Sequence, residues 1–182
     1  MKKALIIIAV LVVALFAFVA YSGLFYSVTV TEKEIGPFTM VLKKNTGSYY
    51  KTGAVFGEVE ESLKKALDTK KLKAIGLYYD DPAKVKEEKL RSECGFIIEK
   101  GDIEKIGALK SGLFVKEFSK TRCAVGEFPL KTFLSYVLGP SKAYPALEAY
   151  GKEKKLSGDF GMEIYDAGSA KILYCMPIGP AQ

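Results

Sequence analysis

The feature that most constrains this chain is an uninterrupted apolar run near its N-terminus. The 25 residues Ala4–Val28 carry no charge, and most of them are Ala, Leu, Ile, Val or Phe. As a helix rising ~1.5 Å per residue, this run reaches roughly 37 Å, enough to cross the ~30 Å hydrocarbon core of a bilayer. Tyr21, Phe25 and Tyr26 would lie at the far interface, where amphipathic aromatic side chains collect. We therefore expect residues 1–26 to form a single-pass membrane anchor.

A cleaved signal peptide is the alternative for this segment. The basic start Lys2-Lys3 suits a signal peptide, but the apolar run exceeds the usual ~7–15 residues. A cut after Ala20 would put the bulky Phe18 at position −3, whereas a cut after Ser22 would put Ala20 there. A buried helix of a soluble protein is a third alternative for the apolar run.

The N-terminal lysines slightly favour a domain outside the cytoplasm. Lys2 and Lys3 tend to keep the N-terminus in the cytoplasm, which places the rest of the chain on the other side. Lys33, Lys43 and Lys44 follow the apolar run, so the charge asymmetry is modest. We expect a membrane protein whose domain side is only weakly specified.

The residue types present exclude several common kinds of enzyme. The 182 residues contain no histidine, which rules out Ser-His-Asp and Cys-His nucleophilic catalysis and His-ligated zinc. Cys94, Cys123 and Cys175 lie far apart with no C-x-x-C spacing, so we expect buried thiols, with one disulfide as the alternative. We expect no metal and no cofactor.

The net charge of +6 does not indicate a nucleic-acid partner. Lysine pairs alternate with Glu and Asp along the chain, and the only two arginines are Arg91 and Arg122. This distribution is typical of a solvated surface, with weak attraction to anionic lipid as the functional alternative.

Beyond the anchor, strand and helix patterns alternate. Two-residue alternation predicts strands at 27–31 and 38–42, and an apolar stripe of Phe56, Val59, Leu63 and Leu67 predicts a helix from near residue 52. The other expected elements are strands at 73–79, 91–99, 161–166 and 171–176, an extended segment at 114–128, a short helix at 102–109, and helices at 132–138 and 141–155 broken at Gly139-Pro140.

The sequence Asp80-Asp81-Pro82 is typical of a turn, and a metal site is the weaker alternative for its two carboxylates.

The element order strand, helix, strand, strand occurs twice. Gly76–Asp81 and Gly161–Asp166 occupy equivalent places, 85 residues apart. The pattern predicts an α+β domain in which two such units pair, each a small sheet with a helix on one face. In this register Leu77 corresponds to Met162, and we expect both to face the helices.

Several segments resemble the GyrI-like small-molecule-binding family. They are Gly47–Tyr49, Gly76–Pro82, Leu90–Gly95, Tyr144–Tyr150 and Met162–Tyr165. The resemblance extends over nearly all the chain beyond the anchor, and it is strongest to the testis-expressed, membrane-anchored ER-phagy receptor branch of the family. It implies a GyrI-like domain at 27–178, followed by a short tail at 179–182.

The resemblance also implies an aromatic cleft between the two units, with a carboxylate at its floor. Members of the family that act in transcription hold lipophilic cations in this cleft, and some members hydrolyse strained electrophiles with glutamates. Alternation alone allows Glu163 to be solvated on an outer face shared with Tyr165. The resemblance places Glu163 in the cleft, the 85-residue register adds Tyr78, and the segment before the first helix adds Tyr49.

This constellation suits a small hydrophobic ligand, with a cation the best match. A carboxylate desolvated by tyrosine rings has a raised pKa unless a cation neutralises it, and aromatic faces attract organic cations. We therefore expect ligand contacts from Glu163, Tyr78, Tyr165 and Tyr49.

Two other functions stay open. A glutamate-dependent hydrolase needs a second acid, for which Glu127 is the best candidate, although a lone glutamate at a strand end is usually solvated. A membrane-tethered protein-interaction module needs only a shallow cleft. Tyr144, Tyr150 and Tyr174 fit cleft lining and core packing equally well, and the sequence assigns no catalytic residue.

Overall fold

The computed structural model describes residues 1–107 and 109–178, so the expected tail at 179–182 lies outside the described residues. The strands are β1 (Val30–Ile35), β2 (Phe38–Thr46), β3 (Lys73–Tyr78), β4 (Arg91–Ile98), β5 (Leu113–Phe118), β6 (Thr121–Pro129), β7 (Gly161–Asp166) and β8 (Lys171–Pro177). The helices are α1 (Lys2–Tyr21), α2 (Thr52–Leu63), α3 (Asp102–Ile106) and α4 (Ser135–Lys154), with single 3-10 turns η1 (Tyr49–Lys51), η2 (Thr69–Lys71) and η3 (Glu87–Lys89).

All of these strands join one antiparallel eight-stranded sheet in the order β1-β6-β8-β7-β3-β4-β2-β5. Two strand-helix-strand-strand units, β2-α2-β3-β4 and β6-α4-β7-β8, each supply three adjacent strands, and β3 pairs with β7 between them. The expected α+β class is therefore confirmed.

Leu77 lies directly opposite Met162. These two residues are equivalent under the 85-residue offset, so a pseudo-twofold axis passes through this pair.

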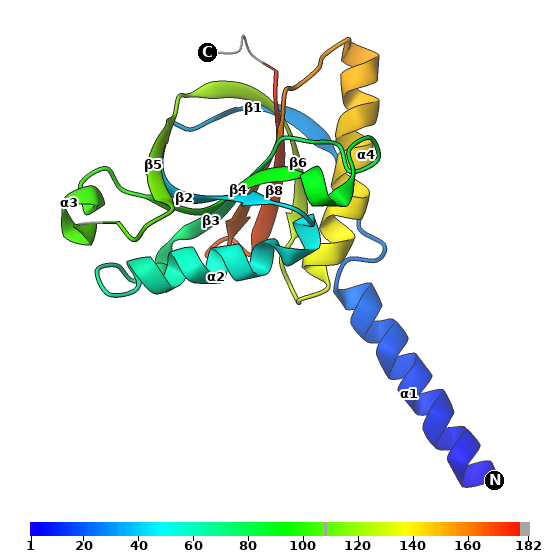
Figure 1. Cartoon of the computed structure of the whole chain (residues 1–182). Helices are drawn as coiled ribbons and strands as arrows, with labels where there is room; N and C mark the ends of the chain where they lie inside the picture. Colours follow the sequence, from blue (N-terminus) through cyan, green and yellow to red (C-terminus); the bar gives the residue numbers. More distant parts are fainter. Residues whose placement is uncertain (108, 179–182) are drawn as a thin grey trace.

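The sheet curves strongly, and α2 and α4 cover its convex side (Figure 1). On that side α2 packs through Val59 and Leu63, and α4 packs through Ala143 and Leu147. The concave face closes on itself around a second core. The members of this core include Ile35, Met40, Leu42, Ile75, Leu77, Val125, Met162 and Ile164.

The expectation that Leu77 and Met162 face the helices is wrong, because both belong to the concave core. Alternation identifies which residues share a face, but here both faces of the sheet are buried. The apolar pattern therefore could not tell which face the helices cover.

The expected break at Gly139-Pro140 is also wrong, because α4 continues through Pro140 and Pro145 to Lys154. Gly139 packs against the sheet, since a Cβ on it would lie only 2.1 Å from the Tyr174 hydroxyl. The Ser141 hydroxyl donates to the carbonyl of Leu138 at 2.8 Å, which supplies a hydrogen bond in the turn where proline provides none. Tertiary packing thus outweighs the local helix-breaking signal.

The helix α1 projects away from the rest of the chain (Figure 1), and its length and composition suffice to cross a membrane. Its C-terminal end is held against the domain. Ser22 is buried, donates a hydrogen bond to the Phe18 carbonyl at 2.7 Å and accepts one from the Thr132 hydroxyl at 2.8 Å. Gly23 fits closely under Phe128, whose ring would lie 2.6 Å from a Cβ. The first two residues after α1, Ser22 and Gly23, are therefore packed against the domain, whereas Phe25 and Tyr26 further along the segment are exposed.

All three cysteines are free and buried, as their spacing led us to expect. Burial raises the pKa of Cys94 to about 12 and that of Cys123 to about 11, and it also raises the pKa of Cys175. The thiols are therefore protonated at neutral pH and serve as small core side chains.

Candidate functional site

Glu163 lies at the centre of the sheet, on the face that the helices cover. In the register its neighbours are Gly76 on β3 and Tyr174 on β8. Only 5% of the residue is exposed. Strand alternation carries Tyr165 to the same face, as the sequence predicts. A carboxylate is thus fixed beneath α4 and away from bulk water.

Both carboxylate oxygens of Glu163 accept hydrogen bonds from tyrosines. The Tyr144 hydroxyl donates to Oε1 at 2.6 Å, and the Tyr165 hydroxyl donates to Oε2. Burial raises the pKa of Glu163, and these two hydrogen bonds offset the increase only in part. Among the described residues, no lysine or arginine pairs with this carboxylate. The site therefore contains a desolvated acid that has no counter-charge within the described part of the chain.

Six tyrosines form a connected set of rings at this acid, and we call them the tyrosine cluster. They are Tyr49, Tyr78, Tyr136, Tyr144, Tyr165 and Tyr174. Their ring centroids pair at 4.9 Å for Tyr49 with Tyr78, 5.6 Å for Tyr136 with Tyr165, and 5.7 Å for Tyr144 with Tyr174.

The two helices meet at this cluster. From α2, the Phe56 ring lies edge-on to Tyr165 at 5.8 Å, and from α4 the cluster receives Tyr136 and Tyr144. The hydroxyl oxygens of Tyr78 and Tyr165 are 3.4 Å apart. Rings from both units therefore enclose Glu163, which is where the resemblance placed a cleft.

Two glycines make room for these rings. A Cβ on Gly76 would lie 2.8 Å from the Tyr78 ring, and one on Gly161 would lie 3.1 Å from Tyr144. The register pairs Gly76 with Glu163 and Gly161 with Tyr78. Tyr78 and Glu163 are thus equivalent positions of the two units, and each faces a glycine that lets side chains fold over the sheet.

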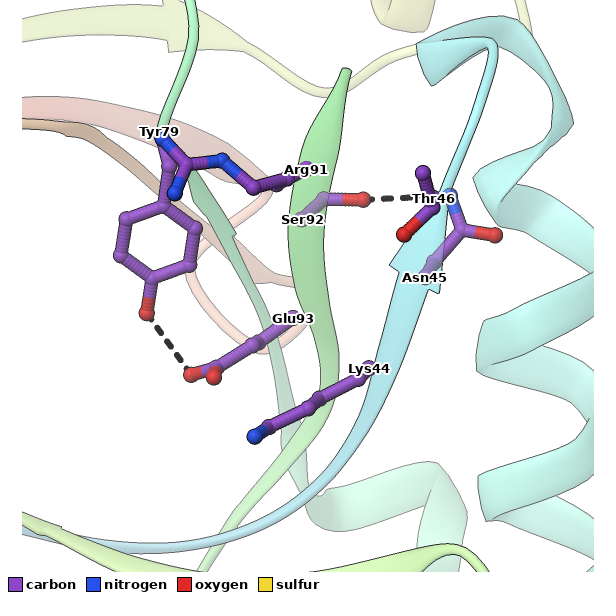
Figure 2. A pocket seen from close by; sticks show the side chains of 7 residues that line it. All are labelled: Lys44, Asn45, Thr46, Tyr79, Arg91, Ser92 and Glu93. Atoms are coloured by element: carbon purple, nitrogen blue, oxygen red, sulfur yellow. Dashed lines mark hydrogen bonds between the residues drawn. The ribbon is translucent and has the colours of Figure 1, made fainter. Parts of the chain in front are cut away.

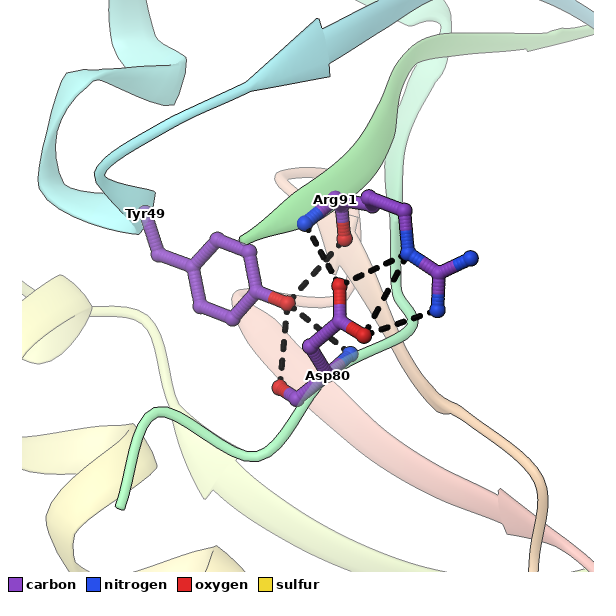
Figure 3. Close-up of polar contacts among 3 residues, drawn as sticks. All are labelled: Tyr49, Asp80 and Arg91. Atoms are coloured by element: carbon purple, nitrogen blue, oxygen red, sulfur yellow. Dashed lines mark hydrogen bonds and ion pairs between the residues drawn. The ribbon is translucent and has the colours of Figure 1, made fainter. Parts of the chain in front are cut away.

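Tyr49 is tied to the first unit by its hydroxyl (Figure 3). This oxygen accepts from the Asp80 amide at 3.0 Å and lies 3.0 Å from the carbonyl oxygens of Asp80 and Arg91, to which it can donate. The Arg91 guanidinium in turn pairs with the Asp80 carboxylate at 2.8 Å and lowers the pKa of that carboxyl. Asp80 therefore belongs to a structural node that holds the Tyr49 ring against Tyr78.

The structure thus brings Glu163, Tyr78 and Tyr165 together, and it adds the ring of Tyr49 at the edge. Tyr144, which the sequence left between lining and packing, is a direct partner of Glu163. Tyr136 was missed, because the expected break at Gly139-Pro140 separated it from the rest of α4. With an unbroken helix, its spacing of eight residues from Tyr144 would have indicated the same face of α4.

The other candidate residues lie away from this site. Glu127 is on the concave face, where Lys171 at 2.7 Å and Lys33 lower the pKa of its carboxyl, so it does not approach Glu163. The Tyr150 hydroxyl donates to Glu32 at the surface, at 2.9 Å. The glutamate that a hydrolase would need as second acid is thus on the opposite side of the sheet.

A cavity of about 310 Å³ lies beside β2 and β4, on the face of the sheet that carries Tyr79 and Glu93 (Figure 2). It is lined by Lys44, Asn45, Thr46, Tyr79, Arg91, Ser92 and Glu93. Glu93 accepts a hydrogen bond from the Tyr79 hydroxyl at 2.7 Å and one from Lys116 at 2.8 Å. The polar groups at its centre are therefore already paired with one another.

Comparison with curated proteins gives relatives of the expected branch. Testis-expressed protein 264 homolog of Mus musculus is 34% identical over 157 residues, covering 82% of this chain and 49% of that protein. Testis-expressed protein 264 of Homo sapiens is 33% identical over 163 residues, covering 85% and 50%. The chain spans about half the length of the curated relatives it matches.

Solved structures share the fold at low sequence identity. The C-terminal domain of EcmrR superposes with a TM-score of 0.61 at 14% identity, covering 85% of this chain and 99% of that one. SAV2435, solved with bound tetraphenylphosphonium, superposes with a TM-score of 0.51 at 13% identity, covering 84% and 94%. The model of the GyrI-like small molecule binding domain matches residues 29–168, which include α2, α4 and the whole tyrosine cluster except Tyr174. The chain therefore belongs to the GyrI-like family of small-molecule-binding domains.

Proposed function

We propose that this protein is a membrane-anchored GyrI-like domain that binds a small hydrophobic cation in the tyrosine cluster, with Glu163 as its counter-charge. The observation that carries the proposal is the carboxylate of Glu163, which is buried, hydrogen-bonded only by tyrosines and unpaired with any described cation. Such a group disfavours its own ionisation until a positive charge approaches. A ligand cation would supply that charge.

The energetics favour an organic cation over a hydrated ion. Much of the cost of desolvating the acid is met when the chain folds, so a ligand mainly has to lose its own hydration. A bulky organic cation is weakly hydrated, and each aromatic face that it meets contributes ~0.5–2 kcal/mol. The rings of Tyr78, Tyr144 and Tyr165 all lie around the carboxylate. Binding requires these rings to separate, since their hydroxyls contact one another or Glu163.

Calorimetry on the full chain in detergent micelles tests the ligand proposal. Tetraphenylphosphonium is the cationic probe, and triphenylphosphine oxide is a neutral control that carries three of the same rings. We expect the cation to bind and the neutral compound to bind at least tenfold more weakly. Equal affinity for both compounds would show that charge plays no part. Binding of neither would leave the protein-interaction module as the better proposal.

The anchor is tested separately. The proposed anchor is α1, which has no buried residue and carries no acidic residue. Alkaline carbonate extraction of membranes that contain the full chain should leave the protein in the pellet. Release of the protein into the supernatant would contradict a membrane-spanning α1.

A further inference from the structure

An apolar surface lies next to the end of α1, at the start of α4. Phe133 is 69% exposed, Val137 59% and Tyr136 52%. All three belong to the segment 131–137, which joins β6 to α4 and includes the first residues of that helix. Large apolar side chains gathered on one short segment mark a contact surface more often than chance exposure.

This segment touches the last turn of α1 at three points. The Phe133 ring lies 6.0 Å from that of Phe18. The ammonium of Lys131 lies 4.9 Å from the centre of the Tyr21 ring. Thr132 donates a hydrogen bond to Ser22 at 2.8 Å. The contacts hold segment 131–137 beside the C-terminal end of α1.

The position of these contacts along α1 gives a depth for each residue. The 20 residues of α1 span ~30 Å, which matches the hydrocarbon core, so Tyr21 lies near the boundary. Phe18 lies three residues, or ~4.5 Å, deeper than Tyr21. Its neighbour Phe133 is therefore at the depth of the outer acyl chains. Lys131, beside Tyr21, is at the depth of the lipid headgroups, where lysine and tyrosine are both favoured.

The same segment forms one wall of the tyrosine cluster. The Tyr136 ring is exposed on one side and contacts Tyr165 on the other, at 5.6 Å, and Tyr165 donates a hydrogen bond to Glu163. Two rings, those of Tyr136 and Tyr165, thus separate the buried acid from the surface that adjoins α1.

We propose that segment 131–137 is seated in the interfacial layer of the bilayer and that the tyrosine cluster opens there. The occupant of this surface is the membrane itself, and the ligand is an amphiphilic cation that reaches Glu163 from the bilayer rather than from water. This inference rests on the proposed function, since it requires α1 to span the membrane. It adds the surface through which the site is reached.

Tryptophan fluorescence provides the test, because the natural chain has no tryptophan. Three single-tryptophan variants of the full chain, Phe133→Trp, Phe18→Trp and Val115→Trp, are placed in vesicles whose lipids carry bromine on the upper acyl chain. Val115 is a matched control, since it is exposed on β5, the edge strand farthest from the β6–α4 connection in the sheet order (Figure 1). We expect strong quenching of Phe133→Trp and Phe18→Trp, at least threefold greater than that of Val115→Trp.

The outcomes separate the two proposals. Quenching of Phe18→Trp without quenching of Phe133→Trp would overturn the seating of segment 131–137 and leave the anchor intact. Absence of quenching in Phe18→Trp would contradict the anchor, and the inference with it.

A fourth variant, Tyr136→Trp, tests the opening of the cluster. We expect its fluorescence to be quenched by the brominated lipid and to change when tetraphenylphosphonium is added. A cation that binds this variant by calorimetry but leaves its fluorescence unchanged would place the ligand elsewhere.

Discussion

Replacing Glu163 by glutamine separates the charge of the site from its shape. Glutamine is nearly isosteric, and its amide oxygen can still accept the hydrogen bond that Tyr144 donates at 2.6 Å. The amide nitrogen cannot accept from Tyr165, but the Tyr165 hydroxyl can turn toward Tyr78, whose oxygen is 3.4 Å away. We therefore expect the tyrosine cluster to keep its arrangement while the site loses the charge of Glu163.

The magnitude follows from the burial of the carboxylate. A cation ~4 Å from Glu163 gains ~4 kcal/mol at an effective dielectric constant of ~20, and the dipole of a glutamine oxygen recovers part of this. The net loss of binding free energy in Glu163→Gln should be about 2–3 kcal/mol, or ~30- to 150-fold in Kd. The free energy of unfolding should change by no more than ~1 kcal/mol, because the loss of charge-assisted hydrogen bonds opposes relief from desolvation.

Titration calorimetry with tetraphenylphosphonium and triphenylphosphine oxide measures the affinity for the cation and the affinity for the neutral compound. The variant should lose affinity for the cation and keep its affinity for the neutral compound within about threefold. The matched control is Glu127→Gln, which removes a carboxylate from the opposite face and should leave cation binding unchanged. Wild-type affinity of Glu163→Gln for the cation would refute the assignment of Glu163 as counter-charge.

Three further results are expected. Gly76→Ala should displace the Tyr78 ring, which lies 2.8 Å from the new Cβ, and lower both the affinity for the cation and the stability by about 1–3 kcal/mol in calorimetry and urea unfolding. Tyr174→Phe should raise the unfolding free energy by about 1 kcal/mol in the same urea assay, because it removes a buried hydroxyl that has no hydrogen-bond partner in the described structure; a loss of stability would contradict this. The pKa of Glu163 is raised in the folded state, mainly by burial, so the folded protein keeps a proton that the unfolded chain releases. Stability should therefore fall as pH rises from the unfolded pKa of ~4.3 through the folded pKa, and this part of the slope should be absent in Glu163→Gln.

Part of the site could be predicted because strand alternation is a local property and the two units repeat at a fixed offset. Alternation alone left Glu163 on a solvated face, and only the family resemblance placed it in a cleft. Alternation put Glu163 and Tyr165 on one face, and the 85-residue offset added Tyr78 from the other unit. Both features depend only on regular strand geometry and on pairing at the centre of the sheet, which the structure shows.

The rest depended on packing between distant elements. The apolar pattern could not show that the helices cover the face of Glu163 rather than that of Leu77, because the sheet curls and buries both. Gly139-Pro140 is a strong breaking signal in sequence, yet Gly139 is needed for contact with Tyr174 and the helix continues. That single misreading concealed Tyr136.

The pseudo-twofold axis through Leu77 and Met162 has a consequence for ligand choice. Tyr78 and Glu163 are related by this axis, so the backbone offers two equivalent places for an acid and this chain uses one of them. Tyr78→Glu would fill the other and set two carboxylates close together. Such a pair would share one proton at neutral pH instead of ionising fully. A doubly charged ligand would be needed to displace that proton. One substitution, at Tyr78 or at Glu163, would thus change the charge of the ligand that the site favours.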